Sequence, residues 1–301
     1  VYLHGGAFTS GAAAEPIYRG HRLSEEGVVV VAPNYRLGPL GFLALPALAE
    51  EDPRAVGNYG LLDVLEALRF VRDYIRYFGG DPKNVTLFGE SAGGMLVCTL
   101  LATPEARGLF QEATVQARAC AYGRPLKEDL ARGEAWAKAR GCDPKDLACL
   151  RALPLERLLP EEPGLEAMGR FLSNPSLFRT GPFKPHLSPF LLPQDPREAL
   201  REGKAAGIPL IAGANAEEVA FPSLQALLGP GDWEEAERRL LESGLSREKA
   251  QALLAHYRKG VPDPKRAWGE VQTDLTLLCP SLKAARLQAP HAPTYAYLFT
   301  F

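Results

Sequence analysis

The sequence has little that would support a metal site or a disulfide scaffold. Its five cysteines form no CxxC pair, which argues against a zinc site. Their odd number in a chain of 301 residues argues against a small fold held by disulfides. Cys98 lies in an apolar run and is interpreted as a buried hydrophobic residue. Cys142 and Cys149 flank a helix-start signal, and the sequence leaves their pairing open.

Basic blocks, long apolar runs and internal repeats are also missing. The formal net charge is −2 and no cluster of Lys and Arg stands out, so no nucleic-acid partner is expected. The longest apolar runs, at 27–32 and 95–102, are far too short to span a bilayer. No targeting segment is visible, but a signal peptide would precede Val1, so the localisation stays open with the cytoplasm slightly favoured. The sequence does not indicate the oligomeric state.

What is present is an alternation of strand and helix patterns in a chain of ordinary globular composition, 46% hydrophobic and 23% charged. Short apolar or alternating runs predict strands, and apolar residues at helical spacing predict helices. The predicted strands are 1–4, 28–32, 84–88, 208–212 and 294–301, and the predicted helices are 60–77, 92–102, 232–243 and 246–259. This order predicts one α/β domain over residues 1–301, with a mostly parallel sheet covered by helices on both faces.

Two features of the sequence qualify the prediction of a single, complete domain. Residues 154–196 are irregular and rich in proline, and are interpreted as a lid or substrate-side insertion. Val1 begins directly on a core strand and residues 294–301 end on another, so both ends look cut. The sequence is therefore interpreted as a fragment.

Gly89-Glu90-Ser91-Ala92-Gly93 matches the pattern G-x-S-x-G. The pattern is weak alone, but here it follows a predicted strand and opens a predicted helix, the context of a nucleophilic serine on a tight turn. Flanking glycines remove the Cβ clashes that such a turn would create. The positive end of the following helix would face a reacting carbonyl. The plainer interpretation is an ordinary N-cap serine at a glycine-rich helix start.

A second glycine-rich segment, His4-Gly5-Gly6-Ala7-Phe8, follows the first predicted strand. Small residues let backbone amides approach a substrate and stabilise the negative charge that acyl transfer places on a carbonyl oxygen. The amides of Gly6, Ala7 and Ala92 are the predicted donors. Taken alone, the segment is better explained as a plain glycine turn.

With these motifs in this order, the chain resembles the type B carboxylesterase and cholinesterase family. The resemblance covers nearly the whole chain and is most specific around Ser91. The matching segments are 1–8, 34–42 (NYRLGPLGF), 57–63 (GNYGLLD) and 78–94 (FGGDPKNVTLFGESAGG), with weaker matches at 108–110, 213–218 and 273–280.

The resemblance implies an α/β-hydrolase fold and hydrolysis of carboxylic esters through a Ser–Glu–His triad, without cofactor or metal. Ser91 matches the nucleophile, and Gly6, Ala7 and Ala92 match the oxyanion donors. Glu218 matches the triad acid, with Glu217 as the lesser candidate, although a lone loop glutamate is usually a solvated surface charge. Arg36 and Asp63 match a pair that forms a structural salt bridge in the family.

The chain also departs from the family pattern. The family's triad histidine follows the last matched segment, so the general base is expected outside these 301 residues. Gln116-Ala117-Arg118 replaces a Gln-Ser-Gly segment whose serine supports the acid in relatives, and Ser188-Pro189 replaces an Asp-Gly turn. The acyl-pocket candidates are Phe178, Gly181 and Phe183.

Five histidines lie within the chain. His291 follows Ser91 and Glu218 in chain order and is the alternative base, although it precedes the final strand. His186 is interpreted as a structural residue, His4 as a residue that shapes the oxyanion loop, and His21 and His256 as surface residues.

The expected function is serine-dependent hydrolysis of a small-molecule carboxylic ester. The alternatives are a partner-binding domain that keeps the fold without activity, thioester or amide hydrolysis at the same site, and a remnant that no longer folds. The fragment itself is expected to be nearly inactive because it lacks the base. The sequence does not identify the ester.

Overall fold

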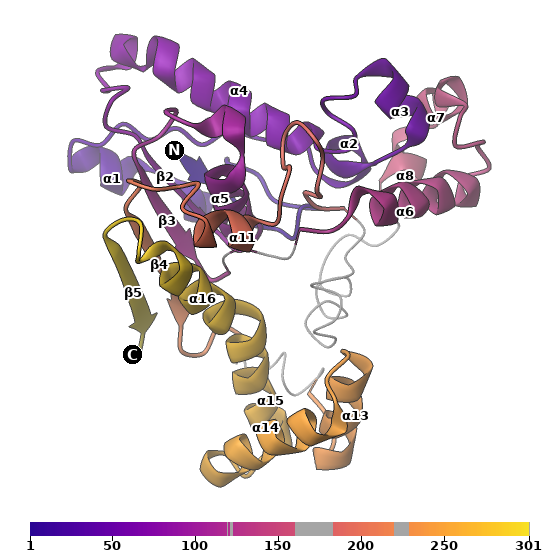
Figure 1. The fold of residues 1–301 in the computed structure, drawn as a ribbon, viewed down its shortest axis with the longest axis vertical. Coiled ribbons are helices and arrows are strands. Elements are labelled where there is room, and N and C mark those ends of the chain that lie inside the picture. The colour runs from indigo at the N-terminus through magenta and orange to yellow at the C-terminus, as the bar shows by residue number, and fades with distance from the viewer. Residues whose placement is uncertain (119, 121–122, 160–182, 220–228, 301) are drawn as a thin grey trace.

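The computed structural model describes residues 1–118, 120, 123–159, 183–219 and 229–300, and is built around one parallel sheet (Figure 1). The strands are β1 (Tyr2–Leu3), β2 (Thr86–Glu90), β3 (Glu112–Gln116), β4 (Leu210–Asn215) and β5 (Thr294–Phe299). They lie side by side in that order, and every neighbouring pair is parallel. Their carboxyl ends therefore meet at one edge, where sheets of this kind bind ligands.

One face of the sheet is buried beneath helices. Leu3, Leu87, Val115 and Ala212 point to this face and are fully buried. The covering helices are α5 (Ala92–Ala102), which contacts β1, β2 and β3, and α16 (Cys279–Gln288), which contacts β4 and β5. The helix α11 (Pro196–Arg201) lies between them and contacts both (Figure 1).

The opposite face is covered less evenly. At β1, Tyr2 packs against Tyr18 of the short 3₁₀ helix η1 (Pro16–Tyr18), with ring centroids 5.1 Å apart. At β4 and β5, Ile211 and Tyr295 are opposite each other in the register and are 44% and 64% exposed.

The longest helix, α4 (Tyr59–Tyr74), forms where apolar residues recur at helical spacing. Its buried side chains form one face, and it continues as η2 (Ile75–Phe78). Gly79 ends the helix with φ = 81°, a left-handed conformation that glycine adopts without steric cost. The remaining helices among the described residues before β4 are α1 (His21–Glu25), α2 (Gly38–Phe42), α3 (Pro46–Glu51), η3 (Pro104–Ala106), α6 (Leu126–Ala139), α7 (Leu147–Ala152) and α8 (Leu155–Leu158).

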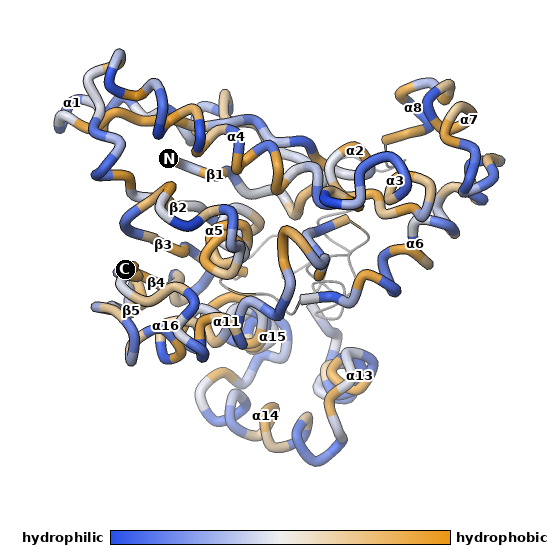
Figure 2. The backbone as a smooth tube through the Cα atoms, turned by 45° about the horizontal axis from the view of Figure 1, so that its top comes forward, coloured by the Kyte–Doolittle hydropathy of each residue, from blue (hydrophilic) through white to orange (hydrophobic). Residues whose placement is uncertain are grey.

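Three helices between β4 and β5 form a unit with its own small core. They are α13 (Trp233–Glu242), α14 (Arg247–Gly260) and α15 (Pro264–Thr273), and a π-helical segment, η4 (Asp274–Leu278), joins α15 to α16. Trp268 lies at the centre of this core and is 1% exposed. Both views show α13 and α14 projecting away from the sheet (Figures 1 and 2). We call α13, α14 and α15 the three-helix unit.

The predicted elements agree with the structure at most positions. Strands are confirmed at the start of the chain, before Ser91, after residue 208 and at 294–299, and the predicted helices correspond to α4, α5, α13 and α14. The strand predicted at 28–32 is wrong. Val28 and Val29 are 48% and 38% exposed, and the segment meets β1 through one backbone hydrogen bond, from Tyr2 N to Val31 O at 2.8 Å, which is too little for a ladder.

The insertion predicted at 154–196 is only partly an irregular surface segment. Residues 160–182 lie outside the described part of the chain. The segment that follows is buried, since Phe183, Leu191 and Leu192 are at most 7% exposed. The backbone of His186 also pairs with that of Arg124 in an isolated parallel β-bridge. These residues belong to the core and not to a lid.

Four of the cysteines are paired. Cys142 and Cys149 form a disulfide, which settles the question that the sequence left open. Cys98 is buried as predicted, at 1% exposed, but it also pairs with Cys120, with Cα atoms 5.1 Å apart. The sequence analysis missed this pair because the two residues come together only when α5 packs on the segment after β3.

Among the described helices, none combines the length and the apolar composition needed to cross a bilayer.

Candidate active site

Ser91 lies on a strained turn between β2 and α5. Its φ of 54° and ψ of −116° are rare for a residue with a side chain. The turn is held by hydrogen bonds from Ser91 N to Gln116 O, 3.0 Å, and from Met95 N to Ser91 O, 3.0 Å. A Cβ atom on Gly93 would lie 1.9 Å from Leu3 O, and one on Gly89 would lie 2.6 Å from the Gly93 carbonyl carbon. The packing of α5 against β1 and β2 therefore requires both glycines of the motif.

The predicted oxyanion loop lies directly beside Ser91. A Cβ atom on Gly5 would be 3.3 Å from Ser91 Cβ and 3.2 Å from Glu90 O, so a larger residue would crowd the serine. Gly6, Ala7 and Phe8 have φ values of 108°, 54° and 64°, and Gly6 O accepts hydrogen bonds from Thr9 N and Ser10 N at 3.0 Å. These left-handed residues turn the backbone sharply after β1.

The third predicted donor, Ala92, is the first residue of α5. The first amides of a helix have no intrahelical partner, and the helix dipole adds positive potential at this end. The structure thus brings the loop of Gly6 and Ala7, the amide end of α5 and Ser91 to the same sheet edge. Such an arrangement suits an attack by Ser91 on a carbonyl whose oxygen becomes negatively charged.

Glu218 follows β4 at the same edge. Its Oε1 atom accepts a hydrogen bond from Asn215 N, 2.8 Å, and its side chain is partly buried. Glu217 is exposed. The surroundings thus distinguish the two neighbours, and they favour Glu218 as the acid.

A second carboxylate, Glu90, lies immediately before Ser91. Burial raises the pKa of Glu90 to about 7, with the negative charge of Glu218 as the second cause. The residue packs against the oxyanion loop, since a Cβ atom on Gly5 would lie 2.5 Å from Glu90 Oε2. The sequence analysis gave Glu90 no role. The available sequence signal was the position of Glu90 at the end of a predicted buried strand, directly before Ser91.

The match to known proteins agrees with this geometry. A model of the carboxylesterase family matches residues 1–301. The chain belongs to the carboxylesterase family. It is 36% identical over 302 residues to the para-nitrobenzyl esterase of Bacillus subtilis (strain 168), covering 99% of this chain and 58% of that protein. It is 40% identical over 219 residues to the fumonisin B1 esterase of Sphingopyxis macrogoltabida, covering 72% of this chain and 38% of that protein.

Solved structures give the same result. The carboxylesterase EST55 of Geobacillus stearothermophilus superimposes with a TM-score of 0.80 at 32% identity, covering 100% of this chain and 61% of that one. A thermophilic PNB esterase gives a TM-score of 0.79 at 34% identity, covering 100% and 59%. These likenesses establish the α/β-hydrolase fold. The chain spans about three fifths of the length of these structures.

The salt bridge that the carboxylesterase resemblance implied is present. Arg36 binds Asp63 through two nitrogens, with Nε–Oδ2 at 2.8 Å and Nη2–Oδ1 at 2.7 Å, and Asp63 Oδ2 also accepts a bond from Arg36 N at 2.9 Å. Such a forked pair fixes the loop before α2 to the first turns of α4.

The segment that departs from the family pattern is strained in the structure. Ala117 and Arg118 have φ values of 49° and 131°, a region that glycine enters without cost and a larger residue does not. Ala117 N donates to Gly213 O at 2.9 Å, so the backbone still pairs with β4. Its side chain carries no oxygen that could hold the acid.

None of the five histidines is placed as a base for Ser91. His291 precedes β5, so it lies at the amino edge of the sheet, opposite Ser91, and its Nε2 atom is 3.0 Å from Arg201 O. His186 is fully buried with Nε2 2.6 Å from Val56 O, which confirms a structural role. His4 stacks on Tyr35 with ring centroids 4.5 Å apart, and its Nδ1 is 2.8 Å from Gly5 O, so it shapes the oxyanion loop. His21 and His256 are exposed, as predicted.

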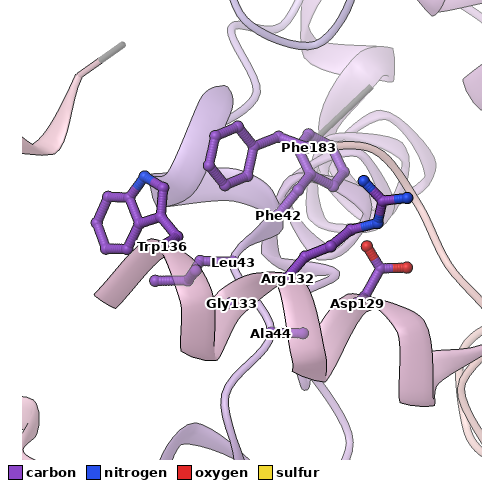
Figure 3. Close-up of a pocket in the computed structure, with 8 residues that line it drawn as sticks. All are labelled: Phe42, Leu43, Ala44, Asp129, Arg132, Gly133, Trp136 and Phe183. Carbon is purple, nitrogen blue, oxygen red and sulfur yellow. The ribbon is translucent and has the colours of Figure 1, made fainter. Parts of the chain in front are cut away.

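Of the three acyl-pocket candidates, Phe178 and Gly181 lie outside the described residues. Phe183 lines a small pocket of about 30 Å³ beside α6 (Figure 3). Its ring meets Trp136 edge to face, with centroids 6.3 Å apart, and Phe42 in the same pocket meets Phe8 at 5.2 Å. Phe42 therefore lines the pocket of Phe183 and also contacts Phe8, which follows the predicted oxyanion donors.

The residues described by the structure contain no group of three or more His, Cys, Asp or Glu side chains that could hold a metal ion.

Proposed function

We propose that this chain carries the nucleophile, the acid and the oxyanion hole of a serine carboxylic ester hydrolase. The observation that carries the proposal is the strained turn at Ser91, which places the serine between the amide end of α5 and the loop of Gly5, Gly6 and Ala7. Backbone strain of this kind persists at sites where function requires it. The chain's membership of the carboxylesterase family supports the reaction class.

In the proposed mechanism, Ser91 Oγ attacks the ester carbonyl as a histidine takes its proton. The amides of Gly6, Ala7 and Ala92 stabilise the oxyanion, and the loss of one such donor typically lowers the rate about 10²- to 10³-fold. The histidine then protonates the departing alcohol, which leaves an acyl group on Ser91. Water, deprotonated by the same histidine, hydrolyses this acyl-enzyme and regenerates the serine.

The general base of this mechanism is proposed to lie outside the 301 residues. The reason is geometric, because His291 is at the opposite sheet edge and the rings of His4 and His186 are held by backbone carbonyls. Glu218 is proposed to orient that base. The 301-residue chain alone is therefore expected to turn over ester substrates very slowly.

The test compares matched variants of the full-length protein on para-nitrophenyl and para-nitrobenzyl esters. Ser91→Ala should lower kcat/KM by about 10³-fold or more, and Glu218→Gln by about 10³- to 10⁴-fold. Glu217→Gln, at the exposed neighbour of the proposed acid, and Ser24→Ala, at an exposed residue of α1, should stay within about twofold of wild type.

Two outcomes would contradict the proposal. Turnover by the full-length protein that survives Ser91→Ala would assign the chemistry elsewhere. Fast turnover by the 301-residue chain would mean that a base is present within it. A leaving-group series with matched esters, thioesters and amides would separate ester hydrolysis from other acyl chemistry on this site. The partner-binding alternative gains no support, since Ser91, Glu218 and the oxyanion loop are all retained.

A further inference from the structure

Three hydrogen bonds between described residues hold the loop that carries Glu218. Asn215 N donates to the Glu218 carboxylate at 2.8 Å, and Ala216 N donates to Phe299 O of β5 at 2.9 Å. Val219 N donates to the hydroxyl oxygen of Thr273 at 3.2 Å. Of these three, only the third uses a side chain from another element. It can therefore be removed by a substitution outside the acid loop, which leaves Glu218 itself unchanged.

Thr273 occupies an unusual position in the chain. It is the last residue of α15, it is fully buried, and the next residue begins the π-helical segment η4. The segment η4 contacts β4, the strand that leads into the acid loop. Short π-helical segments are energetically poor and occur frequently at functional sites. Here the segment brings the end of α15 against the acid loop.

The end of α15 is itself fixed within the three-helix unit. The Tyr257 hydroxyl of α14 donates to Asp274 Oδ2, the residue directly after Thr273. Trp268, one turn earlier on α15, is packed in the unit's core. Thr273 therefore presents its hydroxyl from a rigid support, which is what precise placement of a neighbouring group requires.

From this geometry we infer that Thr273 is a positioning residue for Glu218. This inference rests on the proposed function. The hydroxyl of Thr273 fixes the amide of Val219, and Val219 is covalently next to Glu218. A carboxylate that orients a catalytic base must be held to within a fraction of an ångström. Ala117 offers no side-chain oxygen on the β3 side of the loop, whereas Thr273 supplies one from the end of the three-helix unit.

The test removes the Thr273 hydroxyl and keeps its shape. In the full-length protein, Thr273→Val should lower kcat for a para-nitrophenyl ester on the order of tenfold. It should leave KM within about twofold, because the acid acts in the transition state. Thr273→Ser should recover most of the rate. The matched control is Thr276→Val, which removes a buried hydroxyl three residues later that donates only to Gln272 O, at 2.6 Å, and it should leave kcat unchanged.

Amide hydrogen exchange gives a second measurement that requires no turnover. Peptides covering residues 214–219 should exchange on the order of tenfold faster in Thr273→Val than in wild type, Thr273→Ser or Thr276→Val. Unchanged exchange, or equal losses of kcat in Thr273→Val and Thr276→Val, would overturn the inference. Absence of Ser91-dependent turnover in the wild-type protein would instead overturn the proposed function, and with it the catalytic part of this inference.

Discussion

Glu90 shows how one residue beside the nucleophile couples the site to pH. Burial and the charge of Glu218 raise its pKa to about 7 from the ordinary value of 4.5. Because the pKa is higher in the folded chain than in the unfolded chain, protonated Glu90 favours folding at low pH. This contribution is lost as the pH rises from about 4.5 through about 7.

We therefore expect Glu90→Gln to stabilise the chain more at pH 8 than at pH 5. Between pH 5 and pH 8 the free energy of unfolding of the wild type should fall by about 2 kcal/mol more than that of the variant, since one unit of pKa corresponds to about 1.4 kcal/mol. Urea unfolding of both proteins at each pH measures it. Glu217→Gln, an exposed neighbour of Glu218, is the control. If the two substitutions gave the same pH dependence, Glu90 would not be the titrating group.

At the scale of elements, the three-helix unit has a core separate from that beneath the sheet. Trp268 is 1% exposed and belongs to a buried cluster formed mainly by residues of α13, α14 and α15. Small, separately packed units of this kind open independently of the rest of a protein.

Trp268→Ala should therefore destabilise this unit by about 3–5 kcal/mol, the usual cost of emptying a buried aromatic site. Amide exchange should accelerate in peptides from residues 233–273, whereas peptides from α5 should keep their protection. Tyr77→Ala, at a side chain that is 85% exposed, should leave both regions unchanged. Equal acceleration in α5 would show that the unit and the sheet unfold together.

The elements also show where sequence reasoning succeeds and where it does not. The β2–Ser91–α5 turn was predictable because its glycines and serine form a short sequence pattern between a strand and a helix. The contact of Gly93 with Leu3, which is distant in the sequence, was not. The strand at 28–32 was predicted from its valines alone, but a strand exists only where a neighbour pairs with it. The role of Thr273 was not predictable, because it depends on a hydrogen bond to a residue 54 positions away.

For the whole molecule, the sequence predicted the type of sheet but not all of its strands. Alternating strands and helices predicted a parallel sheet, which is confirmed, but β3 was missed because Glu112 and Thr114 make its pattern half polar. The placement of the histidines required the three-dimensional structure. Chain order permitted His291 as a base, and only the direction of β5 shows that it lies at the wrong edge of the sheet.

The open part of the sheet leads to a last prediction, about association of the 301-residue chain. Ile211, Tyr295 and Phe299 lie on one face of β4 and β5 and are 44%, 64% and 52% exposed. Large apolar side chains grouped on an exposed sheet face favour contact with other molecules. We expect the chain to self-associate through this face.

Sedimentation velocity over a concentration series measures the association. Replacing Tyr295 and Phe299 together by Lys should raise the apparent dissociation constant at least about tenfold, because the face then carries positive charges and loses apolar area, and tenfold corresponds to about 1.4 kcal/mol. Tyr77→Lys adds a charge at a remote exposed aromatic residue and should leave the constant unchanged. A wild-type chain that stays monomeric at every concentration would contradict the prediction, because this face would then remain exposed to solvent without driving association. An equal effect of Tyr77→Lys would mean that net charge, and not the sheet face, controls the association.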